Sequence, residues 1–149
     1  LSRRRSATIG MGKIKLIECL FFLIKFDFFN IQTVVPQTPF FERLLQLMRE
    51  YEMNNVLHNE VVKILHFMLE LEENHPLLTN LFVQGKLIAF LNEQTLEDEA
   101  ILAKIQAKEK GACRRGYLGH IVKIGHMLSN STNPQIIGYL NGKLLGYLD

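Results

Sequence analysis

The sequence has few cysteines and almost no excess of one charge. Two cysteines occur among the 149 residues, Cys19 and Cys113, so neither a disulfide framework nor a cysteine-based zinc site can be built. Lysine and arginine number 17, and aspartate and glutamate 15, which leaves a formal net charge of +2. Domains that bind nucleic acid usually carry a larger basic excess, so we expect no nucleic-acid partner. We expect a reducing compartment, namely the cytoplasm, with the nucleus as a second location.

Long hydrophobic runs are also missing. The longest run, residues 19–24, lies between Glu18 and Lys25 and is much shorter than the roughly 20 apolar residues that span a bilayer. We therefore expect no membrane segment. Three arginines at residues 3–5 resemble the start of a signal peptide, but Lys13 and Lys15 interrupt the apolar stretch that such a peptide needs. Residues 1–11 are expected to form a flexible basic tail.

What the sequence does contain is hydrophobic residues at helical spacing. They make up 48% of the chain, and they recur at i, i+3, i+4 and i+7, whereas the strict alternation of strands is nearly absent. This spacing predicts helices over residues 12–26, 39–51, 56–71, 77–91 and 115–129, and from Asn133 and Pro134 onward. The first of these is apolar on nearly all sides, so it is expected to have several neighbours.

Polar residues and glycines suggest where these helices begin and end. We expect Thr38 to cap the second helix and either Asn54 or Asn55 to cap the third. Gly85 marks a break or a close approach within residues 77–91. The charged residues 93–110 predict a weak helix, or a helix followed by a flexible loop that ends at Gly111; we place a charged loop near residues 93–113.

The expected fold is all-α, either as a closed bundle or as stacked helix pairs. The helices over 39–51 and 56–71 form a natural pair, and so do the last two. We therefore favour a HEAT/armadillo-like helical-repeat solenoid over residues 12–149, although no strict repeat is detectable. Because the sequence starts without methionine and stops abruptly at Asp149, we expect a fragment of a longer array.

Motifs for catalysis are absent. His58 and His66 are eight residues apart, about 12 Å along a helix, and do not form the H-E-x-x-H motif of zinc proteases. Cys113 lies beside two arginines, but nothing nearby in sequence completes a cysteine hydrolase. The glycines near Lys13 and Lys143 do not form a phosphate loop. We expect no enzyme, no metal and no cofactor.

Two segments concentrate polar and aromatic residues at helix starts, residues 54–61 and residues 114–121. In the second, two glycines three residues apart begin a helix, and each glycine costs about 1 kcal/mol relative to alanine. Such glycines usually permit a close backbone approach. Arg115 and His120 should lie near the same helix end, where Tyr117 offers a ring with a polar tip of the kind favoured at interfaces.

These segments resemble signatures of the SAPS-domain family, regulatory subunits of the type 6 (Sit-four-like) Ser/Thr protein phosphatase. Residues 114–121, RRGYLGHI, followed by Ile124, resemble the motif R-R/K-G-Y-M-G-H-L-T-x-I. Residues 54–61, NNVLHNEV, are similar to W-N-N-F-L-H-x-x-V, with Met53 where an aromatic residue is usual. Residues 12–18, GKIKLIE, are similar to G-x-x-R-L-K-x-V-E. The resemblance covers about residues 9–132; Leu118 and residues 122–123 also depart from the pattern.

The resemblance implies a helical-repeat scaffold that binds the phosphatase catalytic subunit and directs it to substrates. The candidates for contact with the partner, or for shaping the ridge that contacts it, are Arg114, Arg115, Tyr117 and His120; Asn54, Asn55 and His58 are further candidate contacts. Each has a structural alternative, because the asparagines can cap a helix, His58 can be a packing histidine, and Gly116 and Gly119 can permit tight packing. The alternative functions are an adapter for another partner, such as trafficking machinery, and a small all-α enzyme.

Overall fold

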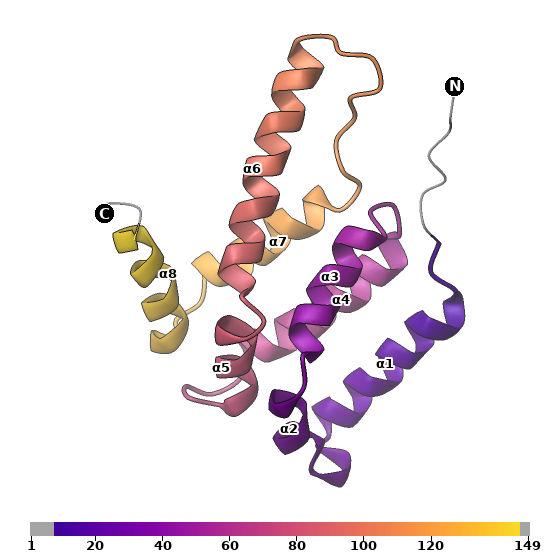
Figure 1. Cartoon of the computed structure of the whole chain (residues 1–149). Coiled ribbons are helices and arrows are strands. Elements are labelled where there is room, and N and C mark those ends of the chain that lie inside the picture. The colour runs from indigo at the N-terminus through magenta and orange to yellow at the C-terminus, as the bar shows by residue number, and fades with distance from the viewer. Residues whose placement is uncertain (1–7, 147–149) are drawn as a thin grey trace.

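The computed structural model describes the backbone of residues 8–146 and the side chains of residues 8–142, and this part of the chain is entirely helical, without strands (Figure 1). Of the expected basic tail, residues 1–7 lie outside the described residues, and Met11 already begins the first helix. The helices are α1 (Met11–Lys25), α2 (Ile31–Val34), α3 (Phe40–Glu50), α4 (Asn55–Leu69), α5 (Pro76–Val83), α6 (Leu87–Gln106), α7 (Leu118–Ser129) and α8 (Pro134–Gly146).

Helix α4 lies at the centre of the fold and packs against α1, α3, α5 and α7 (Figure 1). Its buried side chains include Leu57, Val61, Ile64, Leu65 and Met68, all of which are fully enclosed. Because residues at these spacings share one side of a helix, α4 supplies a continuous apolar surface for its neighbours. The all-α prediction is confirmed for the described residues, and most of the core is built around this helix.

Helix α1 contacts its neighbours on one side only. Ile14, Ile17 and Ile24 are buried, whereas Leu16 and Phe22 are exposed. The expectation that this helix has neighbours on several sides is therefore wrong within the described residues. None of the described helices is both long enough and apolar enough to cross a membrane.

The cap predicted at Asn54 is confirmed and the cap predicted at Thr38 is wrong, while Asn133, the predicted start of the last helix, also caps it. The Asn54 side chain accepts a hydrogen bond from the Leu57 backbone N–H at 2.9 Å, and the Asn133 side chain accepts one from the Gln135 N–H at 2.9 Å. Thr38 does not cap α3, because its hydroxyl donates instead to the Val35 carbonyl at 2.8 Å. That bond closes a short 3-10 turn, η2 (Val35–Gln37), which the sequence did not predict.

The predicted helix over 77–91 is two helices. Gly85 separates α5 from α6, and a Cβ at this position would lie 2.5 Å from the Leu81 carbonyl oxygen and 2.9 Å from Phe41 Cβ. Lys86 follows with a positive φ of 52°, a left-handed conformation that helices do not continue through. The break predicted at Gly85 is therefore confirmed, but a new helix begins immediately after it.

Helix α6 continues to Gln106, so most of the charged loop expected near residues 93–113 is helical. Its outer half extends beyond the other helices, and the following segment, residues 107–117, returns to α7 (Figure 1). The apolar pattern of this stretch is sparse because only Leu87, Phe90 and Gln94 of α6 are buried. A helix with so little buried surface has little hydrophobic periodicity to detect.

The described part of α8 packs against α5. The rings of Tyr139 and Phe82 are stacked with their centroids 4.6 Å apart. The Gln135 amide donates a hydrogen bond to the Thr79 hydroxyl at 2.9 Å. The predicted pairing of the last two helices is thus replaced by these contacts between α8 and α5, while α7 packs on α4.

Candidate functional site

The two unusual sequence segments meet in the structure, at the interface between α4 and the beginning of α7. The His58 ring on α4 lies 5.3 Å from the Tyr117 ring and 5.3 Å from the His120 ring, with both contacts edge-on. Beside them, the His120 Nε2 atom is 3.0 Å from the Asn59 side-chain oxygen. The fold therefore joins two segments that are far apart in the sequence into one cluster around a histidine that has no exposed surface.

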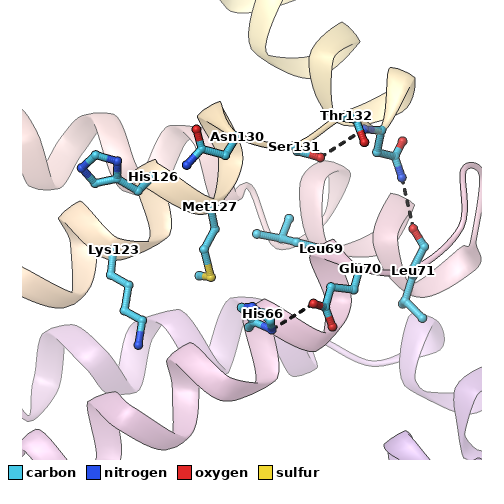
Figure 2. Close-up of a pocket in the computed structure, with 11 residues that line it drawn as sticks. His66, Leu69, Glu70, Leu71, Lys123, His126, Met127, Asn130, Ser131 and Thr132 are labelled. Atoms are coloured by element: carbon cyan, nitrogen blue, oxygen red, sulfur yellow. Dashed lines mark hydrogen bonds and ion pairs between the residues drawn. The ribbon is translucent and has the colours of Figure 1, made fainter.

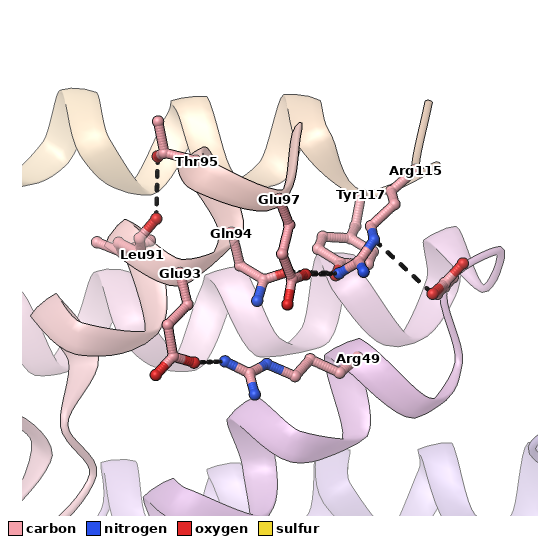
Figure 3. Close-up of polar contacts among 9 residues, drawn as sticks. Arg49, Leu91, Glu93, Gln94, Thr95, Glu97, Arg115 and Tyr117 are labelled. Atoms are coloured by element: carbon pink, nitrogen blue, oxygen red, sulfur yellow. Dashed lines mark hydrogen bonds and ion pairs between the residues drawn. The ribbon is translucent and has the colours of Figure 1, made fainter. Parts of the chain in front are cut away.

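Tyr117 is held in place by a polar residue of α6. Its side chain is 1% exposed, and its hydroxyl donates a hydrogen bond to the Gln94 side-chain oxygen. The Arg115 Nη1 atom donates to the same Gln94 oxygen at 2.9 Å and to the Tyr117 hydroxyl at 2.6 Å (Figure 3). Burial raises the pKa of Tyr117, and the positive charge of Arg115 opposes this in part. The phenol therefore stays neutral and serves as a donor.

Arg115 connects three parts of the chain. Besides its bonds to Gln94 and Tyr117, its guanidinium pairs with Glu97 of α6 and lies 3.8 Å from the Glu52 carboxylate in the turn between α3 and α4 (Figure 3). Burial alone would lower the pKa of Arg115, but the bond with Tyr117 and the two carboxylates outweigh it and raise the pKa. A permanently charged, half-buried arginine thus joins α6 to this turn.

Arg114 makes a different contact, at the surface. Its guanidinium bonds both Asp98 carboxylate oxygens, at 2.7 and 3.2 Å. The Arg114 side chain is exposed, so solvent screens this ion pair and it adds little to stability. Arg114 is the member of the 114–121 segment whose charge is displayed at the surface.

The two glycines of this segment differ in their surroundings. A Cβ on Gly116 would lie 2.9 Å from the Glu52 carbonyl oxygen and 3.3 Å from the Met53 sulfur. A Cβ on Gly119 would have no neighbour within 4 Å. The prediction of a close backbone approach is therefore confirmed for Gly116 and wrong for Gly119.

Burial also affects the two histidines. The pKa of His58 is lowered, first by burial and then by the nearby His120, while the backbone groups of Tyr51 and Met48 act in the opposite direction. Neither ring nitrogen of His58 has a hydrogen-bond partner of good geometry. The pKa of His120 is lowered by burial and by Lys123. Both rings are accordingly neutral at neutral pH.

The acidic and amide partners on α6 were missed by the sequence analysis, which treated this stretch as a solvated face. Gln94, Glu97 and Asp98 stand at i, i+3 and i+4, so they share one side of the helix. That spacing is the only signal in the sequence, and it does not identify the arginines as their partners. A further ion pair, between Arg49 of α3 and Glu93, lies on the neighbouring turn (Figure 3).

The structure corrects part of the predicted contact set. Tyr117 and His58 are buried, so these two residues act inside the fold and do not present a surface to a partner, while the side chain of Asn54, which is half-buried, caps α4. Arg114 and Asn55 are exposed, and Arg115 and His120 are half-buried. These four residues, together with Asn54, are at least partly accessible from outside.

The polar groups of the cluster are largely engaged with one another. The polar atoms of Arg115, Tyr117 and Gln94 bond mainly to one another, and both cysteines are free thiols at other exposed positions. In the part of the chain from residue 8 to residue 146, no three histidine, cysteine or acidic side chains are grouped so that they could hold a metal ion. The arrangement is that of a packing junction with an exposed edge.

Comparison with known protein families gives a match. The family model described as SAPS, SIT4 phosphatase-associated protein, matches residues 26–141, which is well over half of the chain. The matched range contains both segments that meet at His58, whereas the third resembling segment, residues 12–18, lies before it. No curated protein and no solved structure matches the chain.

Proposed function

Because the chain belongs to the SAPS family of SIT4 phosphatase-associated proteins, we propose that it is a non-catalytic regulatory subunit of a type 6-like Ser/Thr phosphatase. In this role it binds the catalytic subunit and directs it to substrates. The observation that carries the proposal is the family match over residues 26–141, which contains both motif segments. The absence of a metal-binding group among the described side chains is compatible with a role in which the reaction belongs to the partner.

We propose that the helices form part of a HEAT/armadillo-like solenoid. Support comes from the packing order, in which α1 and α7 lie against α4 and α3 lies beside it (Figure 1). Stacked helices of this kind present extended surfaces to other proteins. An experimental structure of the complete protein with further helices continuing this stack would agree with the proposal, and one with a closed bundle would contradict it.

We propose that the catalytic subunit contacts an edge formed by Met53, Asn55, Arg114, Arg115 and His120, which we call the docking edge. Met53 is 66% exposed although it is apolar, and it lies against Gly116. Methionine and arginine are enriched at protein interfaces. The buried Tyr117 and His58 support this edge from behind, so the motif would position the contact residues without touching the partner.

The test is affinity capture with the complete protein that carries this sequence. We expect a type 6-like catalytic subunit among the captured proteins, and weaker capture by the double variant Met53→Glu/Arg114→Glu. The matched control is Leu96→Glu/Lys104→Glu, because both positions are exposed on α6 and carry residues of the same two kinds. Capture of transport factors without a phosphatase would favour an adapter function instead.

We also propose a cytoplasmic location, with the nucleus as a second one. Both Cys19 and Cys113 are exposed free thiols, which is typical of proteins in reducing compartments. Imaging of the tagged protein tests this, and accumulation in the secretory pathway would contradict it.

A further inference from the structure

A groove lies over α4, between α1 and α7. Its volume is about 780 Å³, which is room for several side chains of a ligand. Val62 and Phe67 of α4 and Phe21 of α1 provide its apolar lining, with the two phenylalanine rings edge-on and their centroids 5.8 Å apart. Both rings are half-buried, so part of this apolar surface is open to solvent.

The groove continues along α4 into a second hollow of about 810 Å³. The two share His66, Glu70 and Lys123 in their linings. Figure 2 shows Lys123 and Met127 extending from α7 toward the side of α4 that carries His66. We call the combined feature the α4 groove; it is long enough to take an extended segment of chain rather than a single side chain.

The acidic and the basic side chains that line the α4 groove differ in whether they have partners. The carboxylate of Glu60 pairs with Lys63 at 2.7 Å, and that of Glu70 lies 3.6 Å from His66. Glu60 therefore already faces a cationic partner, whereas Glu70 lies beside an imidazole ring.

Lys25 and Lys123 lie on the two walls of the groove, one on α1 and the other on α7. Among the described residues neither lysine forms an ion pair, although the Lys25 ammonium lies 5.8 Å from the centre of the Phe26 ring. The groove thus combines an apolar floor with two cationic walls whose charges are not neutralised.

From this complementarity we propose that the α4 groove binds an acidic linear segment of a partner protein. An apolar side chain of the segment packs against Phe21 and Phe67, and carboxylates on either side of it pair with Lys25 and Lys123. A ligand with charge but no apolar group would leave the aromatic surface exposed, and an uncharged apolar ligand would leave both lysines unpaired. This inference goes beyond the proposed function, since it names a second docking surface made of other residues.

The test is direct binding of synthetic peptides to the full chain, with fluorescence anisotropy as the measure of binding. The probe is a short fluorescein-labelled peptide with a central Leu-Phe pair flanked by Asp and Glu. The comparison peptide has Asn and Gln in place of the acids. We expect the acidic peptide to bind roughly tenfold more tightly at low ionic strength, and the difference to shrink as salt is added.

Variants locate the binding site. Lys25→Glu/Lys123→Glu should weaken binding of the acidic peptide by about tenfold or more, and Lys25→Gln/Lys123→Gln should produce a smaller loss in the same direction. The matched control, Lys13→Glu/Lys104→Glu, changes the net charge equally at exposed lysines outside the groove and should leave binding nearly unchanged. Circular dichroism confirms that each variant folds.

Three outcomes overturn the proposal: equal affinity for the acidic and neutral peptides, no binding by the folded chain, or equal losses in the groove and control variants. Because this test contains no phosphatase, its failure would leave the regulatory-subunit proposal standing. Failure to capture a phosphatase would likewise leave the peptide result unaffected.

Discussion

The ring of His58 lies edge-on against the ring of Tyr117, with the two centroids 5.3 Å apart and the ring planes inclined at 72°. This contact joins the two segments that most resemble the SAPS family. Both rings are buried, so these motif residues hold α7 on α4. Surface contacts are left to the exposed neighbours on the docking edge.

Tyr117→Phe should destabilise the protein by about 1 kcal/mol, because the hydroxyl bonds both Gln94 and Arg115 in a buried setting. The matched control is Tyr139→Phe, since that hydroxyl has only a 3.5 Å contact with Gln135 and should matter less. Urea unfolding, monitored by circular dichroism, measures the free energy of unfolding of each variant. Equal losses in the two variants would contradict the role assigned to the Tyr117 hydroxyl.

The two glycines provide an internal comparison. Gly116→Ala should cost about 1–3 kcal/mol, because the new methyl group would overlap the Glu52 carbonyl. Gly119→Ala should be neutral or stabilising by up to about 1 kcal/mol, because its Cβ enters open space on a helix. Thermal unfolding of the two variants shows whether each substitution stabilises or destabilises the protein. A larger loss of stability for Gly119→Ala than for Gly116→Ala would contradict the packing described.

Asn54 and Asn55 allow a similar comparison at the beginning of α4. Asn54→Ala removes the cap on the Leu57 N–H and should cost about 1 kcal/mol. Asn55→Ala, at an exposed position with no such bond, should change stability by less than about 0.5 kcal/mol. Chemical denaturation distinguishes them, and the reverse order would rule out Asn54 as the cap.

The helices that could be predicted from the sequence are those with a wide buried side. Helices α3, α4 and α7 each bury residues at helical spacing, and their predicted ranges agree with the structure to within a few residues. The caps at Asn54 and Asn133 were also accessible to sequence analysis, because a cap depends on neighbours only a few residues away.

Contacts between distant residues were not predictable in the same way. The motif segments could be recognised, but which of their side chains point inward depends on how α4, α6 and α7 pack together. The polar tip of Tyr117 predicts an interface residue, but in the structure its hydroxyl donates a hydrogen bond to Gln94, which belongs to a stretch whose sequence is typical of a solvated face. The segment over residues 26–37 was missed because three of its residues, Asp27, Phe29 and Asn30, adopt positive φ without a glycine to signal it.

Stability should depend on pH through the histidine pair. Burial lowers the pKa of His58 and His120 in the folded chain, while in the unfolded chain both should titrate near their ordinary value of about 6.5. As the pH falls through that value, the unfolded chain takes up protons that the folded chain does not, so the free energy of unfolding decreases. At a pH above about 6.5 the histidines are neutral in both states, so the full stability is retained.

Urea unfolding at a series of pH values between about 7.5 and 5 measures the effect. His58→Gln should show a weaker dependence on pH than the unchanged chain, because one of the two groups no longer titrates. His66→Gln is the control, since His66 is exposed on the same helix. Identical pH profiles for His58→Gln and the unchanged chain would contradict the burial of a neutral imidazole.

Binding of the purified, complete protein to a purified type 6-like phosphatase catalytic subunit tests the central claim most directly. Biolayer interferometry should give saturable binding that the Met53→Glu/Arg114→Glu variant weakens by about tenfold or more, while Leu96→Glu/Lys104→Glu binds like the unchanged protein. No binding by protein whose circular dichroism and unfolding transition are normal would contradict the assignment as a phosphatase regulatory subunit.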